Sequence, residues 1–119
     1  MLVVEDSMII AIDTEECFRS LGLETVAVQG TVDGALKCLE RETFDLALLD
    51  FNLGTESSER VAEDLKARGI PFWLATGYGE MAERLDEMGA QGLLVKPYGR
   101  EELSRMLSDF ANLGRDAAS

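Results

Sequence analysis

Side chains that can do chemistry stand at the ends of several short apolar segments. Asp50 ends the run Leu46–Leu49, which shows no polar alternation and therefore predicts a strand buried on both faces. Other apolar segments end in the same way, at the pair Glu5 and Asp6, at Thr76 and at Lys96. Carboxylates, a hydroxyl and a lysine are groups that can hold a hard divalent cation and a phosphoryl group. Asp50 is then expected to be a carboxylate nucleophile that forms an aspartyl phosphate.

Three carboxylates that converge on one point repel one another unless a counterion is present. Mg²⁺ resolves this repulsion, since it prefers oxygen ligands and takes one or two carboxylates while keeping several waters. We expect Asp6 and Asp50 to bind the ion directly and Glu5 to act through water. Zinc is not expected, because the sequence has no histidine and no cysteine pair with ligand spacing. Lys96 as a point charge and Thr76 as a donor suit the phosphoryl oxygens.

Each of these residues, taken alone, also has an ordinary structural explanation. Asp6 is a suitable helix N-cap and Thr76 a suitable turn residue. Lys96 with Pro97 is equally consistent with a simple strand exit. The joint pattern is more specific than its parts, because function in open α/β sheets lies beyond the carboxyl ends of the strands.

The elements that would position these residues alternate strand and helix along the chain. Apolar runs predict five strands, at 2–4, 23–28, 45–50, 70–75 and 92–95. Helical spacing predicts a helix over 8–21 and one after each later strand, the fourth carrying Met81, Leu85 and Met88. The pattern predicts an α/β, doubly wound, flavodoxin-like (βα)5 fold, a three-layer sandwich with parallel strand order 2-1-3-4-5. In that order the reactive strand ends are neighbours, and the unreactive strand at 23–28 lies at the margin.

Composition excludes several classes of protein. The chain has 119 residues and a net charge of −12, which argues against direct nucleic-acid binding. No apolar run is long enough to cross a membrane and no secretory signal opens the chain, so we expect a cytoplasmic protein. We predict one domain over residues 1–113 and a frayed tail over 114–119.

Three stretches, LVVEDS at 2–7, LALLDFNLG at 46–54 and LVKPYGREEL at 94–103, resemble a bacterial two-component response-regulator receiver domain. The resemblance implies that Asp50 is the phosphoacceptor and that Asp6, Asp50 and the backbone carbonyl of Asn52 hold Mg²⁺, with Glu5 completing the acidic pair. It also implies that Thr76 is a switch hydroxyl and that Lys96 contacts the phosphate. The peptide bond between Lys96 and Pro97 is often cis in this family.

The stretch IPFWLATGYGE at 70–80 is similar to the FATGYG signature of a subgroup of stand-alone receivers, with Leu74 replacing its first Phe. Typical receivers carry an aromatic switch residue where this chain has Leu93, and a proline in the loop that here reads Leu53 and Gly54. Our hypothesis is that the loop at 76–79 moves instead, with Tyr78 as the ring that swings. A surface tyrosine in a flexible turn is the alternative.

The resemblance implies a signalling protein that catalyses only its own phosphorylation and autodephosphorylation. Its expected donor is a histidine kinase or a phosphotransfer protein, and its expected reader is a partner protein on the face formed by the fourth helix, fifth strand and fifth helix. The alternatives within the family are the receiver segment of a hybrid histidine kinase and a phosphate sink. An aspartyl-phosphate phosphohydrolase and a flavin-binding domain are less favoured, the first because a substrate cap does not fit in 119 residues.

Overall fold

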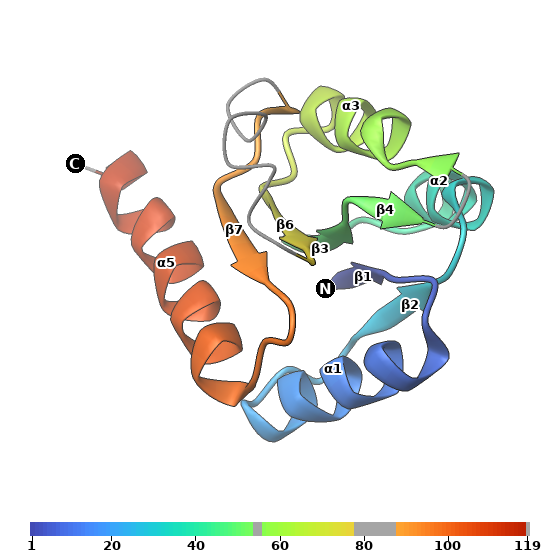
Figure 1. Cartoon of the computed structure of the whole chain (residues 1–119). Helices are drawn as coiled ribbons and strands as arrows, with labels where there is room; N and C mark the ends of the chain where they lie inside the picture. Colours follow the sequence, from blue (N-terminus) through green and yellow to red (C-terminus); the bar gives the residue numbers. More distant parts are fainter. Residues whose placement is uncertain (54–55, 78–87, 119) are drawn as a thin grey trace.

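Five parallel strands form one sheet in the order β2-β1-β3-β6-β7, which is the order predicted from the sequence (Figure 1). The computed structural model describes residues 1–53, 56–77 and 88–118. The sheet strands are β1 (Leu2–Val4), β2 (Ala27–Gln29), β3 (Ala47–Asp50), β6 (Phe72–Thr76) and β7 (Gly92–Val95). The helices are α1 (Met8–Ser20), α2 (Val32–Arg41), α3 (Glu59–Ala67) and α5 (Arg100–Ala118). A small antiparallel hairpin, β4 (Asn52–Leu53) with β5 (Glu56–Ser57), follows β3.

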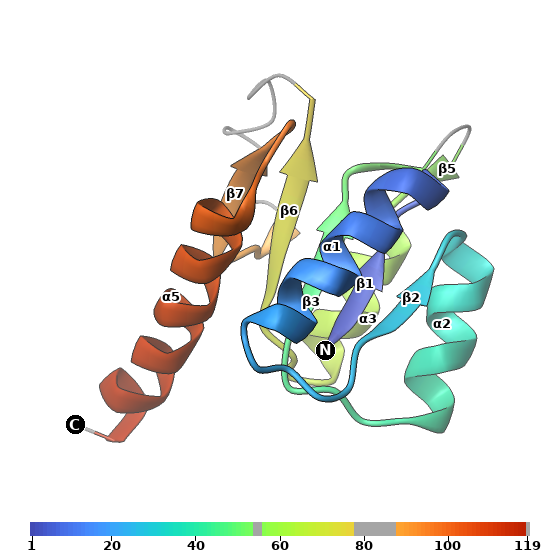
Figure 2. The same ribbon diagram turned by 90° about the horizontal axis from the view of Figure 1, so that it is seen from below.

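Helices cover both faces of the sheet, so the core consists of two apolar clusters. Figures 1 and 2 show α2 and α3 on one side and α1 and α5 on the other. Leu2 and Val4 of β1 enter the cluster under α2 and α3, whereas Val3 between them enters the cluster under α1 and α5. Successive side chains of a strand point to opposite faces. Burial on both faces therefore explains why the strand sequences show no polar alternation.

Local signals at the helix ends agree with the predicted boundaries. Ser7 is the N-cap of α1, where its Oγ accepts a hydrogen bond from the backbone N–H of Ile10 at 3.5 Å. Gly22 follows the helix with a φ of 105°, in the left-handed region that glycine adopts without strain. Thr31 caps α2 in the same way as Ser7 caps α1, through the N–H of Gly34 at 3.0 Å. The helix predicted over 8–21 is thus confirmed to within one residue.

The second strand is shorter than predicted and lies further along the chain. Residues 23–26 are not in a strand, and β2 begins at Ala27 and ends at Gln29. Within the described part of the chain, β2 is an edge strand beside β1, and its three residues pair with the three residues of β1. Val26 is buried against the α1 and α5 cluster, which accounts for the apolar run that suggested a longer strand.

Two further predictions concern the later part of the chain. Of the predicted fourth helix, Met81 and Leu85 lie outside the described residues, whereas Met88 is buried in the cluster under α2 and α3. The backbone of α5 is helical through Ala118, and the boundary expected between the domain and its tail at residue 113 stays a prediction. Across the described helices, none is long and apolar enough to cross a membrane.

Candidate functional site

The predicted site residues meet at the carboxyl edge of the sheet. Glu5 and Asp6 follow β1, Asp50 ends β3, Thr76 ends β6 and Lys96 follows β7. These four strands are contiguous in the sheet, and β2 lies at the margin as expected. One ligand atom from each of Glu5, Asp6 and Asp50 lies within 4.8 Å of the others. The convergence predicted from the strand ends is therefore present.

Lys96 joins two of the three carboxylates. Its Nζ lies 2.7 Å from Glu5 Oε1 and 3.0 Å from Asp50 Oδ2. The carboxylate side chains are 2% and 4% exposed, so both charges are almost removed from water. Burial lowers the pKa of Lys96, but its close contacts with Glu5 and Asp50 and their negative charges outweigh burial, and the pKa is raised above its ordinary value. The lysine is therefore firmly charged at neutral pH.

The backbone of Lys96 is fixed as firmly as its ammonium group. Its N–H donates to the carbonyl oxygen of Thr76 at 2.7 Å, which continues the pairing of β6 with β7 by one residue. The peptide bond between Lys96 and Pro97 is cis, as the family resemblance implies. Thr76 itself is 8% exposed at the end of β6. The two residues expected to contact a phosphoryl group are thus joined directly through their backbones.

Asp6 is not the cap of α1, because Ser7 occupies that position. The structural alternative for Asp6 as an N-cap is therefore wrong. Its side chain is exposed, whereas Glu5 and Asp50 are buried. Asp6 thus lies on the solvent side of the carboxylate cluster, where an ion that keeps several waters can be reached.

The charge balance and the donor atoms of this cluster fit a hard divalent cation. Three carboxylates against one ammonium leave two negative charges in the cluster. Glu5 Oε2 accepts a hydrogen bond from the N–H of Ser7 at 3.1 Å. Glu5 Oε1 is buried and has no hydrogen-bond partner among the described residues, although it forms the 2.7 Å ion pair with Lys96. Mg²⁺ requires oxygen ligands with free lone pairs and a surplus of negative charge, and this cluster has both.

Three further residues were predicted to take part in metal binding or in switching. Leu93 is half-buried in β7, pairs with Leu74 and packs on the cluster under α2 and α3. Asn52 lies in the hairpin directly after Asp50, where its backbone pairs with Ser57. Tyr78 lies outside the described residues. The position expected to carry an aromatic switch thus holds a packed aliphatic side chain.

Sequence reasoning missed a polar contact beside the site. The hydroxyls of Tyr98 and Thr14 lie 3.0 Å apart. Thr14 Oγ1 donates to the carbonyl of Ile10 at 2.8 Å, so the Tyr98 hydroxyl is the donor to Thr14. Burial raises the pKa of Tyr98. Both residues line a cavity of about 880 Å³ between α1 and the segment after β7, which Lys96 also reaches. A threonine in the middle of an apolar helix face was the available signal.

Comparison with known proteins decides the family. The sequence matches the family described as "Response regulator receiver domain" over residues 1–108. The chain belongs to this family. Receiver domains are signalling phosphoacceptors of two-component systems rather than enzymes that act on metabolites. The strand order and the acidic cluster are thus those of a phosphoacceptor module.

Individual relatives support the assignment. The chain is 27% identical over 106 residues to the transcriptional regulatory protein PdtaR of Mycobacterium tuberculosis, covering 87% of this chain and 52% of PdtaR. A receiver domain protein from Methanospirillum hungatei is 26% identical with a TM-score of 0.85, covering 97% of this chain and 95% of that one. The receiver domain of the sensor histidine kinase PA1611 from Pseudomonas aeruginosa is 27% identical with a TM-score of 0.81, covering 92% and 93%. Its structure has a magnesium ion coordinated in the active site cleft. The receiver thus spans about half the length of the curated relatives it matches.

Proposed function

We propose that Asp50 accepts a phosphoryl group from the phosphohistidine of a histidine kinase or a phosphotransfer protein. A carboxylate oxygen of Asp50 would attack phosphorus while the bond from phosphorus to the imidazole nitrogen breaks, and the electron pair of that bond stays on the imidazole. The observation that carries the proposal is the placement of Asp50: it is buried at the end of a central strand, 3.0 Å from Lys96 and within 4.8 Å of two other carboxylates.

The acidic cluster is proposed to hold Mg²⁺ through Asp6, Asp50 and the backbone carbonyl of Asn52, with Glu5 acting through water. When bound, the ion neutralises the charge that develops on the transferred oxygens. Support comes from the two excess negative charges of the cluster and from the accepting capacity of Glu5 Oε1. The magnesium-bound PA1611 receiver domain offers a parallel in a related protein.

Lys96 and Thr76 are proposed to act on the phosphoryl oxygens. In the structure Lys96 is bound to Glu5 and Asp50, and a phosphoryl group on Asp50 would offer the ammonium group stronger acceptors. Thr76 ends the strand beside β3, where its hydroxyl is a suitable donor. Because the Lys96 N–H donates a hydrogen bond to the Thr76 carbonyl, a displacement of the backbone at one residue would displace the backbone of the other.

The output side of the proposal follows the stand-alone subgroup marked by the FATGYG-like stretch. Leu93 packs on the core and has no ring to reorient, which supports a switch in the loop at 76–79 with Tyr78 as its moving side chain. Tyr78→Ala protein that shows the same structural response to phosphorylation as the wild type would remove this idea. The proposed reader is a protein that binds the face built from the fourth helix, β7 and α5, and the proposed location is the cytoplasm.

A second candidate within the family is the receiver segment of a hybrid histidine kinase. The similarity to the receiver domain of the sensor kinase PA1611 favours it. A phosphate sink is the related variant. Phosphotransfer assays separate these roles. A hybrid segment or a sink transfers its phosphoryl group to a histidine-containing protein, whereas a stand-alone regulator binds an output partner.

The first experiment mixes the protein with acetyl phosphate and Mg²⁺ and records the intact mass. The wild type is expected to gain about 80 Da, the mass of one phosphoryl group, and to show no gain when a chelator replaces Mg²⁺ from the start of the reaction. Asp50→Asn should show no gain. Asp45→Asn is the matched control, because Asp45 is an exposed aspartate just before the same strand and should label as the wild type does. Equal labelling of Asp50→Asn and the wild type would overturn the assignment of Asp50.

A further inference from the structure

Ser58 has the position of a helix cap but does not make a cap hydrogen bond. It directly precedes α3, and it is fully buried, with 0% of its surface exposed. A serine at this position normally accepts a hydrogen bond from a backbone N–H in the first turn of the helix. Here the hydroxyl makes no such bond and donates instead to the carbonyl oxygen of Phe51, at 2.9 Å.

This hydrogen bond fixes the peptide that follows the proposed phosphoacceptor. The N–H of Phe51 donates to the carbonyl of Ala75 at 2.9 Å, so Phe51 is held by β6 on one side and by Ser58 on the other. Because a peptide unit is planar, holding the carbonyl of Phe51 also sets the plane of the Phe51–Asn52 peptide. The orientation of the backbone that enters Asn52 therefore depends on the Ser58 hydroxyl.

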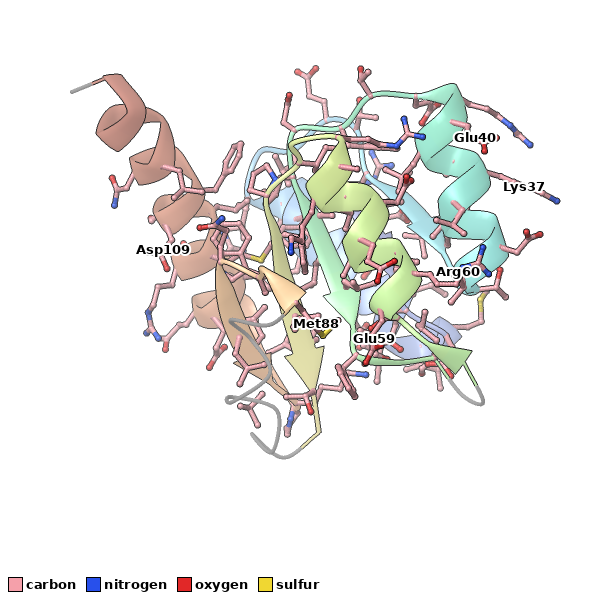
Figure 3. The ribbon with its side chains drawn as sticks, turned by 90° about the horizontal axis from the view of Figure 1, so that it is seen from above. Lys37, Glu40, Glu59, Arg60, Met88 and Asp109 are labelled. Atoms are coloured by element: carbon pink, nitrogen blue, oxygen red, sulfur yellow. The ribbon has the colours of Figure 1, made fainter. Side chains whose placement is uncertain are left out.

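The rest of the loop reinforces this arrangement. Asn52 pairs with Ser57, and Leu53 pairs with Glu56, in the β4–β5 hairpin. Leu53 is buried in the cluster under α2 and α3, which anchors the hairpin to the core. Figure 3 shows the first turn of α3, marked by Glu59, beside this hairpin. The hairpin thus brings Ser57 beside Asn52, and Ser58 forms its hydrogen bond with the residue that follows Asp50.

We propose that Ser58 is a positioning residue for the cation site. Its hydroxyl fixes the Phe51–Asn52 peptide before Asn52, and the pairing of Leu53 with Glu56 restrains the chain after it, so that together they set the direction of the backbone carbonyl of Asn52. Groups that orient a metal ligand, without touching the metal, commonly change metal affinity when they are removed. This inference rests on the proposed function, in which Asn52 supplies a backbone ligand.

A purely structural role for Ser58 makes a different prediction. If the hydroxyl only stabilises the start of α3, its removal lowers stability and leaves Mg²⁺ affinity unchanged. If it positions Asn52, its removal weakens Mg²⁺ binding, and phosphorylation recovers at higher Mg²⁺ because Asp50 and Lys96 are intact. The two roles differ in which measurement changes.

The test compares Ser58→Ala with Ser20→Ala and Ser58→Thr. Ser20 is a suitable control because its exposed hydroxyl also donates to a backbone carbonyl, that of Cys17 at 2.7 Å, away from the carboxylates. Mg²⁺ affinity is measured by calorimetric titration of the unphosphorylated protein, and acetyl phosphate labelling is measured against Mg²⁺ concentration. Ser58→Ala should bind Mg²⁺ about tenfold more weakly, and its labelling should approach the wild-type rate at saturating Mg²⁺. Ser20→Ala should match the wild type, and Ser58→Thr, which keeps the hydroxyl, should bind more tightly than Ser58→Ala.

The outcomes separate the inference from the proposed function. Wild-type Mg²⁺ affinity in a folded Ser58→Ala protein would overturn the positioning role and leave the phosphoacceptor assignment intact. A wild type that neither binds Mg²⁺ nor labels would overturn both. If Ser58→Ala does not fold, Ser58→Cys, which has a similar size and a weaker donor, gives the same comparison.

Discussion

The two ends of the central strands are both buried but differ in chemistry. At the amino ends of β1, β3 and β6 stand Leu2, Ala47 and Phe72, none more than 1% exposed. At the carboxyl ends stand Glu5, Asp50 and Thr76, with 3%, 4% and 8% exposed. Burial stabilises the first group, whereas removing the two carboxylates from water costs free energy that Lys96 must offset. One edge of the sheet therefore contributes stability through buried apolar side chains, whereas the other edge holds buried charged groups together.

The largest expected effect tests the apolar edge. Phe72→Ala should lower the free energy of unfolding by about 3–5 kcal/mol, because it removes a buried aromatic ring and leaves a cavity. Urea denaturation measures this loss. Thr76→Val, at the other end of the same strand, is the control and should change stability by about 1 kcal/mol or less, because it replaces a hydroxyl with a methyl group and leaves no cavity. Equal losses in the two variants would show that the edges do not differ in the way described.

The second effect tests the charged edge. Lys96→Met leaves Glu5 and Asp50 buried without their cation, which should lower the free energy of unfolding at neutral pH by about 2–4 kcal/mol. Mg²⁺ should restore part of this loss, and it should stabilise the variant more than it stabilises the wild type. Denaturation with and without Mg²⁺ measures both quantities. A variant as stable as the wild type would mean that Lys96 does not offset the buried charges.

A smaller effect is expected where the charged edge meets α1. Tyr98→Phe removes the hydrogen bond to Thr14 and should lower the free energy of unfolding by about 1 kcal/mol. Burial raises the pKa of Tyr98 in the folded protein, so folding favours the neutral phenol. That contribution is complete below the unfolded pKa of about 10 and is lost as pH rises through the higher folded value. Denaturation at increasing pH should therefore show a steeper loss in the wild type than in Tyr98→Phe, and parallel curves would contradict the assignment.

The smallest effect concerns an exposed ion pair on α2. On α2, Lys37 Nζ lies 3.1 Å from Asp33 Oδ2, but the two side chains are 61% and 77% exposed. Lys37→Ala should change the free energy of unfolding by less than about 0.5 kcal/mol, because water and salt screen the pair. The contrast with Lys96→Met isolates burial, since both variants remove one lysine from an ion pair. A large loss of unfolding free energy in Lys37→Ala would mean that exposed ion pairs contribute as much to stability as the buried one.

The predicted fold and site depended on features that a sequence displays directly. Unbroken apolar runs that end at Asp50 and Lys96 identify buried strands and their ends, and parallel topology brings such ends together. The second strand was predicted too long because Val26 extends its apolar run, although that residue is buried outside the strand.

Contacts between side chains distant in the sequence were equally hidden. Tyr98 meets Thr14 across 84 residues, and nothing local to either residue indicates the other. Ser58 shows the opposite difficulty. Its local sequence predicts a conventional cap, and only the folded loop reveals that its hydroxyl turns back to Phe51. Local propensity was overridden by the path of the chain around the site.

The hydrogen bond from the N–H of Lys96 to the carbonyl of Thr76 separates the position of the backbone from the position of the charge. It anchors the main chain of the lysine to the sheet, while the ammonium group lies at the end of a four-carbon stem. Relocating the positive charge therefore requires rotation about side-chain bonds and release of the ion pairs with Glu5 and Asp50, but it does not require the pairing of β6 with β7 to break.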